Sequence, residues 1–382
     1  MAVLKILMLN YEFPPIGGGA GKAHLCLLKE YAGNSELIID VLTSAPKPGF
    51  TTEKLAENIT VYKVGVHKKN LHFWRKIEVI EWLTKAHIHY RRLLGRNNYD
   101  LAHAFFGFPT GWLCYRTRKR LPYMISLRGS DVPGRHARLI LEYKLLGPVF
   151  KAIWTKATLL VACSEGLKIR SLRFLPSVSI DVIPNGVELD RFHPGRTDEN
   201  KDVLKLLTVG RLSVTKRVEM LVEAVERLYR DGHSVHFAIV GGGGMERRLR
   251  QIVLRKELSH IIEVTGRIAP EKMPDLYHYS DVFISASMQE GMSNAMLEAM
   301  ASGLPIITTR CEGVEELVAD NGVVVEQANA ASIAQAVAKL AGDSQGYERM
   351  CLAARKRAEN FSWSYVAEQY LASYQRVAKS GQ

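Results

Sequence analysis

Short apolar runs alternate with segments of helical periodicity along most of the chain. Short runs of Val, Ile, Leu and Ala without alternation are typical of strands buried on both faces of a parallel sheet. In the first half these runs are Val3–Leu9, Ile38–Leu42, Leu101–Ala104, Tyr123–Leu127 and Leu159–Cys163. Between them, Lys22–Tyr31 and Leu71–Leu94 carry apolar residues three and four positions apart, which predicts helices.

The second half repeats this scheme. Its strand-like runs are Lys205–Val209, His236–Val240, Ile261–Thr265, Val282–Ser285, Pro305–Thr308 and Gly322–Val325. The helical segments between them are Arg217–Asp231, Met245–Glu257, Pro270–Tyr279 and Asn294–Ser302. Strands that alternate with helices predict an α/β protein with parallel sheets covered on both faces, here built twice. Two doubly wound domains would bind ligands in a cleft at the carboxyl ends of their strands.

Composition limits the class of protein. A chain of 382 residues with 47% hydrophobic and 24% charged residues is typical of a soluble globular protein with two domains. Its apolar runs are too short to cross a bilayer, and the first ten residues fit a buried strand better than a signal peptide. Five scattered cysteines without a C-x-x-C pair argue against a disulfide framework or a zinc site, and for a reducing cytoplasm.

Positive charge is concentrated in the first half. The net charge is +12, and residues 60–160 contain about 19 Lys or Arg against about 5 Asp or Glu. A basic first half predicts contact with something anionic, such as an acidic lipid surface, a diphosphate-linked acceptor or nucleic acid. A basic surface that only keeps the protein soluble is the alternative.

The segment from Glu290 to Glu298, E-G-M-S-N-A-M-L-E, holds two carboxylates beside a predicted helix start. Gly291 permits a tight turn, and Ser293 or Asn294 can cap the helix. Amides at a helix N-terminus suit a diphosphate, whereas ionised carboxylates suit hydroxyl-rich groups. The pattern therefore fits a nucleotide-sugar site. The alternative is that both glutamates are solvated side chains on an exposed helix, which would have the same sequence.

A basic loop follows the strand at 205–209. It reads G-R-L-S-V-T-K-R over residues 210–217 and places Arg211 and Lys216 at the carboxyl end of that strand. A guanidinium and an ammonium can neutralise a diphosphate without a metal ion. Because the chain has no D-x-D pair, we expect no metal at the site. A solvated basic loop is the alternative.

Two glycine-rich turns complete the set of loops. Residues 14–22, P-P-I-G-G-G-A-G-K, follow the first strand but fit neither a Walker P-loop nor G-x-G-x-x-G. They allow close approach of a ligand to the backbone, or form a plain strand–helix turn. The run Gly241–Gly244 also lacks the dinucleotide spacing and could be a flexible turn.

Together and in this order, these motifs resemble the family 4 glycosyltransferases, which are retaining enzymes of the GT-B fold. The matching segments are P-P-I-G-G-G-A-G, S-L-R-G-S-D-V at 126–132, V-I-P-N-G-V at 182–187, the 210–217 loop, T-G-R-I at 265–268 and residues 290–305. The resemblance implies two Rossmann-like doubly wound domains facing across a cleft. We expect an acceptor-binding domain at 1–192, a linker at 193–203, a nucleotide-sugar domain at 204–360, and a helix at 361–382 that crosses back to the first domain.

The resemblance also implies roles for particular residues. Arg211 and Lys216 match the diphosphate-binding pair, Glu298 the carboxylate at the ribose, and Glu290 the carboxylate at the sugar hydroxyls. The main chain would hold the remaining parts of the donor. The phosphates and sugar would contact Gly291, Met292, Ser293 and Asn294, and the nucleobase would contact Ile268. Gly18 and Gly19 would close over the donor from the first domain.

Arg128 departs from the family pattern, in which many members carry histidine at this position of S-L-R-G-S-D-V. Arginine donates hydrogen bonds and stays charged, but it cannot shuttle a proton near neutral pH. We therefore expect Arg128 to act electrostatically on the leaving diphosphate, or to bind an anionic acceptor. His103, at the end of a predicted strand, is either a second polar group in the cleft or a structural histidine.

The implied function is retaining transfer of a hexose from a UDP- or GDP-sugar to a glycan or lipid-linked acceptor, in polysaccharide or glycolipid biosynthesis. Glu290, Arg128, Arg211 and Lys216 would be its catalytic residues, with no cofactor or metal. The alternatives are a nucleotide-sugar epimerase of GT-B fold and a non-enzymatic nucleic-acid binder. No RNA- or DNA-binding motif supports the latter, so nucleic acid is not an expected partner.

The segment from His72 to Leu94 suggests where the protein is located in the cell. It carries Trp82, Tyr90, Arg91 and Arg92, and an aromatic, basic helix can lie on an anionic membrane surface. The cysteines already favour a cytoplasmic protein, and this helix adds the expectation of peripheral association with the inner face of the cell membrane. The alternative is that the aromatic residues pack in the domain core.

Overall fold

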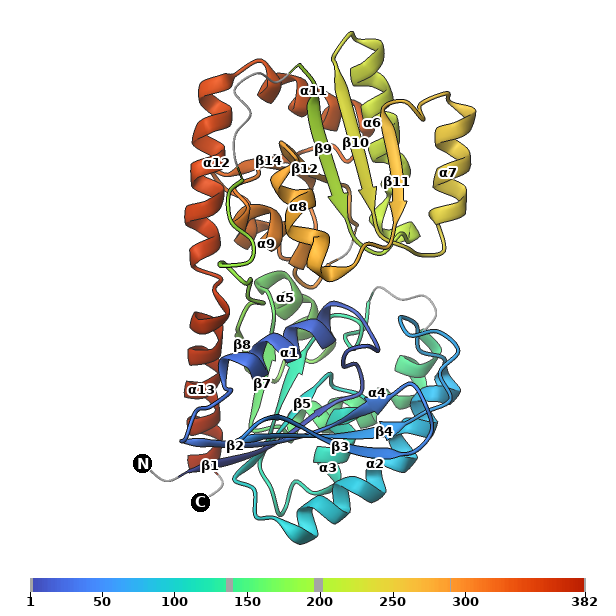
Figure 1. Ribbon diagram of the computed structural model, residues 1–382. Coiled ribbons are helices and arrows are strands. Elements are labelled where there is room, and N and C mark those ends of the chain that lie inside the picture. Colours follow the sequence, from blue (N-terminus) through green and yellow to red (C-terminus); the bar gives the residue numbers. More distant parts are fainter. Residues whose placement is uncertain (1–2, 135–139, 196–201, 289, 381–382) are drawn as a thin grey trace. The chain divides into compact units, whose positions relative to one another are not determined.

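The computed structural model describes residues 3–134, 140–195, 202–288 and 290–380, which form two compact units (Figure 1). Unit 1 contains the chain up to Gly186 together with the segment from Trp363 onward, and unit 2 runs from Val187 to Ser362. The boundary therefore precedes the linker expected at 193–203, of which residues 196–201 lie outside the described part. Val187 belongs to unit 2 because it pairs with Ser362.

Unit 1 is built on an eight-stranded sheet in the order β3-β4-β2-β1-β5-β6-β7-β8. Among the described strands of this sheet, only β3 and β4 pair in an antiparallel way. The strands are β1 (Leu4–Asn10), β2 (Leu37–Ala45), β3 (Phe50–Ala56), β4 (Ile59–Gly65), β5 (Leu101–Phe105), β6 (Tyr123–Leu127), β7 (Leu159–Ala162) and β8 (Ile180–Val182). The parallel pairing places the loops after β1, β5 and β6 at one edge of the sheet.

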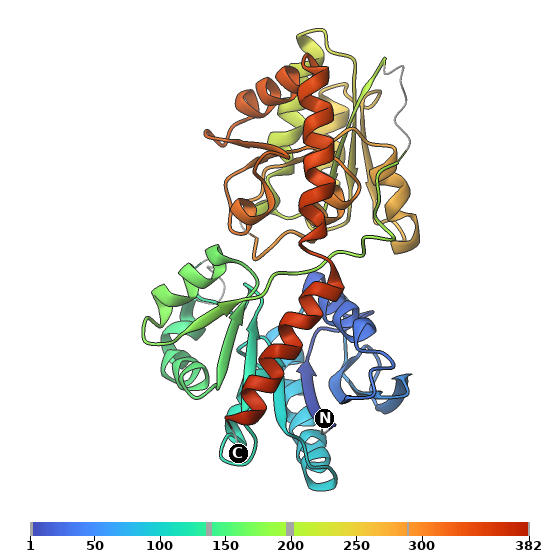
Figure 2. The ribbon, with the colours of Figure 1, turned by 90° about the vertical axis from the view of Figure 1, so that its left-hand side faces the viewer.

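Helices cover both faces of this sheet. They are α1 (Gly19–Glu30), α2 (Lys76–Arg96), α3 (Thr110–Arg116), α4 (Ile140–Thr155), α5 (Glu165–Phe174) and α13 (Trp363–Lys379). Helices α1 and α13 pack together on one face, while α2, α3 and α4 contact one another in series on the other. Figure 2 shows α13 lying across the strands of unit 1, although it is the last helix of the chain.

Unit 2 has a parallel six-stranded sheet in the order β11-β10-β9-β12-β13-β14. This is the doubly wound arrangement, in which the order of the strands reverses between β9 and β12. The strands are β9 (Leu204–Val209), β10 (Val235–Val240), β11 (Ile262–Gly266), β12 (Val282–Ser285), β13 (Ile306–Thr309) and β14 (Gly322–Val325). The α-helices are α6 (Val218–Arg230), α7 (Glu246–Arg255), α8 (Met273–His278), α9 (Asn294–Ala301), α10 (Val314–Leu317), α11 (Ala330–Ala341) and α12 (Ser344–Glu359).

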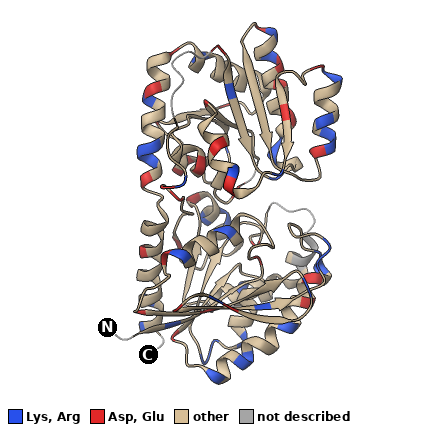
Figure 3. Cartoon of the chain, in the orientation of Figure 1, with Lys and Arg blue, Asp and Glu red and all other residues tan. Residues whose placement is uncertain are grey.

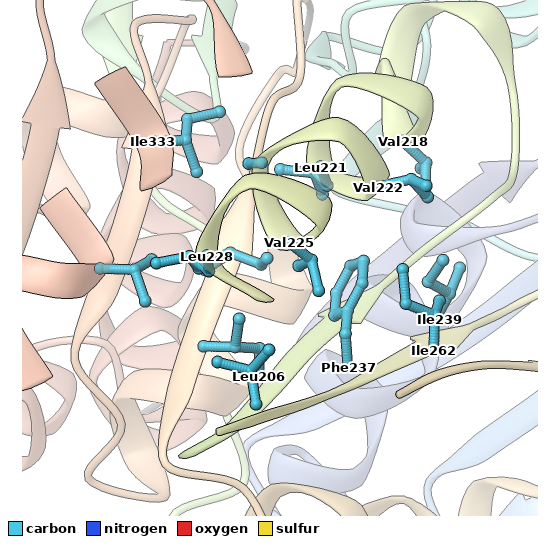
Figure 4. Close-up of a cluster of buried hydrophobic side chains, with 14 of the residues drawn as sticks. Leu206, Val218, Leu221, Val222, Val225, Leu228, Phe237, Ile239, Ile262 and Ile333 are labelled. Carbon is cyan, nitrogen blue, oxygen red and sulfur yellow. The ribbon is translucent and has the colours of Figure 1, made fainter. Parts of the chain in front are cut away.

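The core of unit 2 shows why the chain folds in this way. Helix α6 carries Leu221, Val222, Val225 and Leu228 at helical spacing, and all four are buried. In Figure 4 they lie against the strand residues around Phe237. Full burial of an aliphatic side chain of this size stabilises the fold by about 1.5–3 kcal/mol. The apolar side of α6 therefore packs on one face of β9 and β10 and buries it.

Every strand that the apolar runs predict is present, which confirms the two Rossmann-like sheets. The sequence pattern missed β3, β4 and β8, and the helices α3, α4, α5, α10, α11 and α12. Strand β3 was missed because its residues are mostly exposed and polar, so they lack an apolar run.

Candidate functional site

The loops after β9 and β12 lie side by side, because these two strands are parallel neighbours. The backbone N–H of Met288 donates to the carbonyl of Thr215 at 2.8 Å and joins the two loops directly. This contact brings the 210–217 loop beside the segment that starts at Glu290. Two of the motifs found in the sequence therefore form one site at the carboxyl edge of the unit 2 sheet.

Lys216 and Glu290 are in direct contact at this edge. The Nζ of Lys216 donates to Oε1 of Glu290, and the Ser287 hydroxyl donates to the same oxygen at 3.0 Å. The side chains are 23% and 14% exposed, so the pair is partly shielded but still reachable from solvent. The cation expected at the diphosphate and the carboxylate expected at the sugar thus occupy adjacent positions.

Helix α9 begins directly after these residues. Ser293 is its N-cap, and the Ser293 side chain accepts from the N–H of Met296 at 3.4 Å. The structure thereby selects Ser293 over Asn294 as the cap, with Asn294 as the first helical residue. The positive end of the helix dipole faces this edge of the sheet.

Glu298 lies one turn into α9 and is buried. The hydroxyl of Tyr277, on α8, donates to its Oε2 at 2.9 Å. Burial, and then the charge of Glu298, raise the pKa of Tyr277 well above its ordinary value, so this hydroxyl stays a donor. Tyr277 was not among the predicted site residues, because a buried tyrosine in a short helix carries no recognisable motif by itself.

A small cavity at the carboxyl end of β9 is bordered by several of these groups. Arg211 and Lys216 are among its lining residues, together with Ser285, Ser287 and Ser293. Arg211 is exposed, so its guanidinium is available to a ligand. The cavity therefore combines two cations with several hydroxyl groups, a lining suited to an anionic ligand.

The 241–244 glycine run shapes this edge and does not behave as a free turn. A Cβ at Gly241, whose φ is +135°, would lie 1.9 Å from the carbonyl oxygen of Gly210. The N–H of Gly210 donates to Val240 and that of Leu212 to Gly242, at 3.0 and 3.1 Å. Only glycine permits this close approach of the two loops.

Arg217 ends the 210–217 motif but was not among the predicted site residues. Its role is structural. Its Nε donates to the carbonyl of Ala286 at 2.7 Å, and its Nη2 donates to Thr309 at 3.0 Å. It therefore connects the loops after β9, β12 and β13. Its φ of 47° lies in the left-handed region, so this connection is made from a strained backbone position.

The other predicted positions of unit 2 lie along the same edge. Gly291 and the buried Met292 form the turn into α9, and Gly313 packs against them: a Cβ on Gly313 would lie 2.8 Å from the carbonyl oxygen of Gly291. Ile268 follows β11 and is half-buried. Because β10 separates β11 from β9, Ile268 occupies the far side of this edge from Glu290.

Three predicted residues belong to unit 1. Gly18 is the N-cap of α1 and Gly19 its first residue, so both lie in the turn after β1. The turn is tied to the loop before α2: the N–H of Gly17 donates to the carbonyl of Leu71, and the ring of His72 bonds to the carbonyl of Gly17, both at 2.8 Å.

Arg128 follows β6, and unit 1 holds its side chain in place. Its Nη1 donates to Asn185 at 2.7 Å, its Nη2 donates to the Tyr370 hydroxyl at 3.4 Å, and its guanidinium lies 4.8 Å from the centre of the Phe105 ring. Asn185 belongs to the V-I-P-N-G-V motif, so two predicted motifs meet here. Tyr370 comes from α13, which gives the end of the chain a part in orienting Arg128.

His103 is a core residue. It has no exposed surface, and its ring bonds to the hydroxyls of Tyr374 and Ser126 at 3.0 and 2.8 Å. Burial, and then the charges of His24 and Arg128, hold its pKa well below the ordinary value. The structural interpretation is therefore correct, and His103 does not reach a solvent-facing site.

Solved structures with similar folds include a sucrose-phosphate synthase and a glycosyltransferase of lipopolysaccharide biosynthesis. Sucrose-phosphate synthase from Thermosynechococcus elongatus has a TM-score of 0.83 with 19% identity, covering 99% of this chain and 100% of that one. WaaG, a glycosyltransferase involved in lipopolysaccharide biosynthesis, has a TM-score of 0.74 with 16% identity over 97% and 99%. Anabaena HepE, solved with UDP and glucose, has a TM-score of 0.71 with 18% identity over 98% and 100%. These likenesses confirm the GT-B fold class.

Sequence comparison identifies the family. An uncharacterized glycosyltransferase of Methanocaldococcus jannaschii is 25% identical over 369 residues, 95% of each chain. D-inositol 3-phosphate glycosyltransferase of Nocardia farcinica is 29% identical over 305 residues, 72% of this chain and 66% of that one. Residues 22–191 match the model described as Glycosyltransferase Family 4, and residues 204–343 match that described as Glycosyl transferases group 1. Because these two models together match most of its length, the chain belongs to the glycosyltransferases.

Proposed function

We propose that this glycosyltransferase moves a sugar from a nucleoside diphosphate donor to a glycan or lipid-linked acceptor, with retention of configuration and without a metal ion. The observation that carries the proposal is the contact between Lys216 and Glu290 beside the N-terminus of α9. A cation, a hydroxyl acceptor and a helix dipole at one edge match the diphosphate and the sugar of such a donor.

The diphosphate is the leaving group of this reaction. As the bond to the anomeric carbon breaks, negative charge grows on the leaving oxygen. Arg211, Lys216 and the amides at the start of α9 stabilise that charge, and pre-arranged groups of this kind supply a large part of enzymatic rate acceleration. They also take the place of the metal ion that other enzymes use to neutralise a diphosphate.

The two glutamates bind neutral parts of the donor. Glu298 accepts hydrogen bonds from the ribose hydroxyls and Glu290 from those of the sugar. Main chain at Gly291, Met292, Ser293 and Asn294 holds the phosphates and the sugar, and Ile268 marks the main chain that contacts the base. Gly18 and Gly19 contribute backbone contacts to the donor from unit 1.

When the donor binds, Lys216 exchanges part of its contact with Glu290 for the phosphate oxygens. Lys216 and Arg211 then face the negative charges of the diphosphate together. The exchange frees Oε1 of Glu290 from Lys216 for a sugar hydroxyl, while the Ser287 hydroxyl keeps the carboxylate oriented.

Arg128 serves the same reaction from unit 1, through its fixed positive charge. It stabilises the leaving diphosphate and does not transfer a proton, since arginine stays charged at all accessible pH. Its orientation is set by Asn185 and Tyr370. In this proposal an oxygen of the departing diphosphate takes the proton of the acceptor hydroxyl. The acceptor oxygen forms its bond to the anomeric carbon on the face from which the diphosphate leaves.

Names of similar proteins support the donor and acceptor classes. HepE of Anabaena was solved in complex with UDP-glucose. The relatives at 25% and 30% identity include an amylovoran biosynthesis glycosyltransferase of Erwinia amylovora and a putative colanic acid biosynthesis glycosyltransferase of Escherichia coli. A UDP- or GDP-sugar donor and a polysaccharide or glycolipid product are accordingly proposed for this chain.

A thermal-shift screen against UDP-, GDP- and ADP-sugars tests the donor, because a ligand that binds the folded state raises the melting temperature. One base should give a clear shift that Lys216→Ala reduces. Proton NMR of the product should then show the anomeric configuration of the donor. No shift with any nucleotide-sugar, or a product of inverted configuration, would contradict the proposal.

A further inference from the structure

The solvent-facing side of helix α2 (Lys76–Arg96) carries an exposed apolar stripe. Ile77, Ile80 and Ile88 are 68%, 62% and 50% exposed. With the exposed Thr84 they follow a spacing of three and four residues, so they share one side of the helix. Phe73, 45% exposed, precedes the helix four residues before Ile77. Isolated apolar residues are common at protein surfaces, but a stripe of isoleucines along one helix is not.

The opposite side of α2 is already buried against the sheet. Trp82, Ala86 and Tyr90 have no exposed surface, and α2 contacts β2 and β4. The proposed membrane role of Trp82 and Tyr90 is therefore wrong, because both pack in the core of unit 1. Since the inner side satisfies the fold by itself, the isoleucines on the outer side are not needed for packing.

Positive charge accompanies the stripe. Residues 67–96 contain eight Lys or Arg and two Glu, and Figure 3 shows basic residues spread along α2. Arg91 lies three residues after Ile88, and Arg91 and Arg92 are both exposed. Among the residues that the structure describes, no carboxylate pairs with either of these arginines.

The two carboxylates of this segment are engaged within unit 1. Glu78 is buried and accepts from Lys68 at 2.8 Å and from Arg75 at 2.7 Å. Burial opposes its ionisation, but these hydrogen bonds outweigh burial and lower the pKa of Glu78 to about 2. Glu81 pairs with Lys85 and His67, each at 2.7 Å. Basic neighbours therefore offset both carboxylates, and the segment keeps a net positive charge.

From these observations we infer that the outer side of α2 docks on an anionic membrane surface. The isoleucines enter the interface between headgroups and acyl chains, and Arg91 and Arg92 contact lipid phosphates. A second copy of the chain is a poorer occupant, because its own α2 would bring the same positive charge to the contact. No helix that the structure describes is long and apolar enough to cross a membrane.

Co-sedimentation of the full chain with vesicles tests this inference without any sugar donor, so its outcome is independent of the proposed reaction. Vesicles of phosphatidylcholine with phosphatidylglycerol should bind the wild type, and phosphatidylcholine alone should bind it much less. The triple variant Ile77→Ser, Ile80→Ser, Ile88→Ser should lose at least about tenfold in partitioning. Arg91→Gln with Arg92→Gln should lose about fivefold per residue at low salt.

A matched control removes equally exposed apolar residues elsewhere. Ile169, Leu254 and Leu352 are 53%, 70% and 74% exposed on α5, α7 and α12. Replacing all three by serine should leave vesicle binding unchanged. The inference is overturned if the wild type ignores phosphatidylglycerol, or if the α2 triple variant binds as well as the wild type. It is also overturned if that variant only converts a dimer to a monomer in sedimentation equilibrium.

Discussion

The Tyr277 hydroxyl donates a 2.9 Å hydrogen bond to Glu298, and the two residues come from different helices, α8 and α9. This bond fixes one oxygen of a buried carboxylate. A residue that lies beneath the donor site therefore positions a group that we propose to contact the ribose.

Tyr277→Phe should raise the donor KM about tenfold and change kcat little. A hydrogen bond to a charged group is worth about 1.5 kcal/mol or more, and ribose binding contributes equally to the ground and transition states. Steady-state kinetics separate the two constants. Tyr279→Phe, which removes an exposed hydroxyl two residues further on, is the control. An unchanged KM in Tyr277→Phe alongside a raised KM in Glu298→Gln would show that the hydrogen bond has no positioning role.

Arg128→Gln should lower kcat by about a hundredfold, the usual cost of losing a group that stabilises charge in the transition state. Arg128→His should restore part of the rate at low pH only, because a histidine loses its charge near pH 6.5 whereas arginine does not. The pH profile of kcat measures this difference. Lys119→Gln, an exposed change in the same unit, should be silent. A wild-type kcat in Arg128→Gln would remove Arg128 from the mechanism.

Acid should destabilise unit 1 already between pH 6.5 and 5. Burial, and then the charge of Arg128, lower the pKa of His24 to about 3, and burial lowers that of His103 as well. The unfolded chain binds protons at these histidines below pH 6.5 and the folded chain does not, so stability is lost as the pH falls. The expected slope is about 1.4 kcal/mol per pH unit for each histidine.

Urea unfolding at pH 7 and pH 5 measures that slope. His24→Gln and His103→Gln should each reduce the difference between the two pH values, while His260→Gln, an exposed histidine of unit 2, should not. Equal pH dependence in the wild type and in both core variants would contradict the assignment of these histidines as neutral in the folded state.

Chelation should leave turnover unchanged, because we propose that Arg211, Lys216 and the start of α9 neutralise the diphosphate. The measurement is the initial rate after dialysis against EDTA, with and without added Mg²⁺ or Mn²⁺. A rate that disappears on dialysis and returns with either ion would show that the proposed cationic groups do not suffice.

Apolar runs predicted the strands well because a strand buried on both faces has no polar positions to interrupt its run. Strand β3 escaped prediction because it is an exposed edge strand, where packing does not select apolar residues. The amphipathic pattern of α2 was misread for a related reason. The sequence shows apolar residues on two sides of this helix, one with Trp82 and one with Ile80. It does not show which of the two sides packs on the sheet.

Short motifs predicted the unit 2 site because its residues lie in two loops whose strands are neighbours. The contact between Lys216 and Glu290 follows from that adjacency, although 74 residues separate them. Tyr277 and Arg217 escaped prediction because they act through hydrogen bonds to groups distant in sequence. The glycines at 241–244 were ambiguous because only the neighbouring loop, at Gly210, shows what they approach.

Donor turnover in Lys216→Ala and Glu290→Ala tests the central claim most directly. Lys205→Ala, on the exposed side of the same β9, and Glu263→Ala, exposed on β11, are matched controls that remove the same charges away from the site. We predict that both site variants lose at least about a hundredfold in kcat/KM with the cognate nucleotide-sugar while both controls keep wild-type rates. Unchanged turnover in Lys216→Ala and Glu290→Ala would contradict the account.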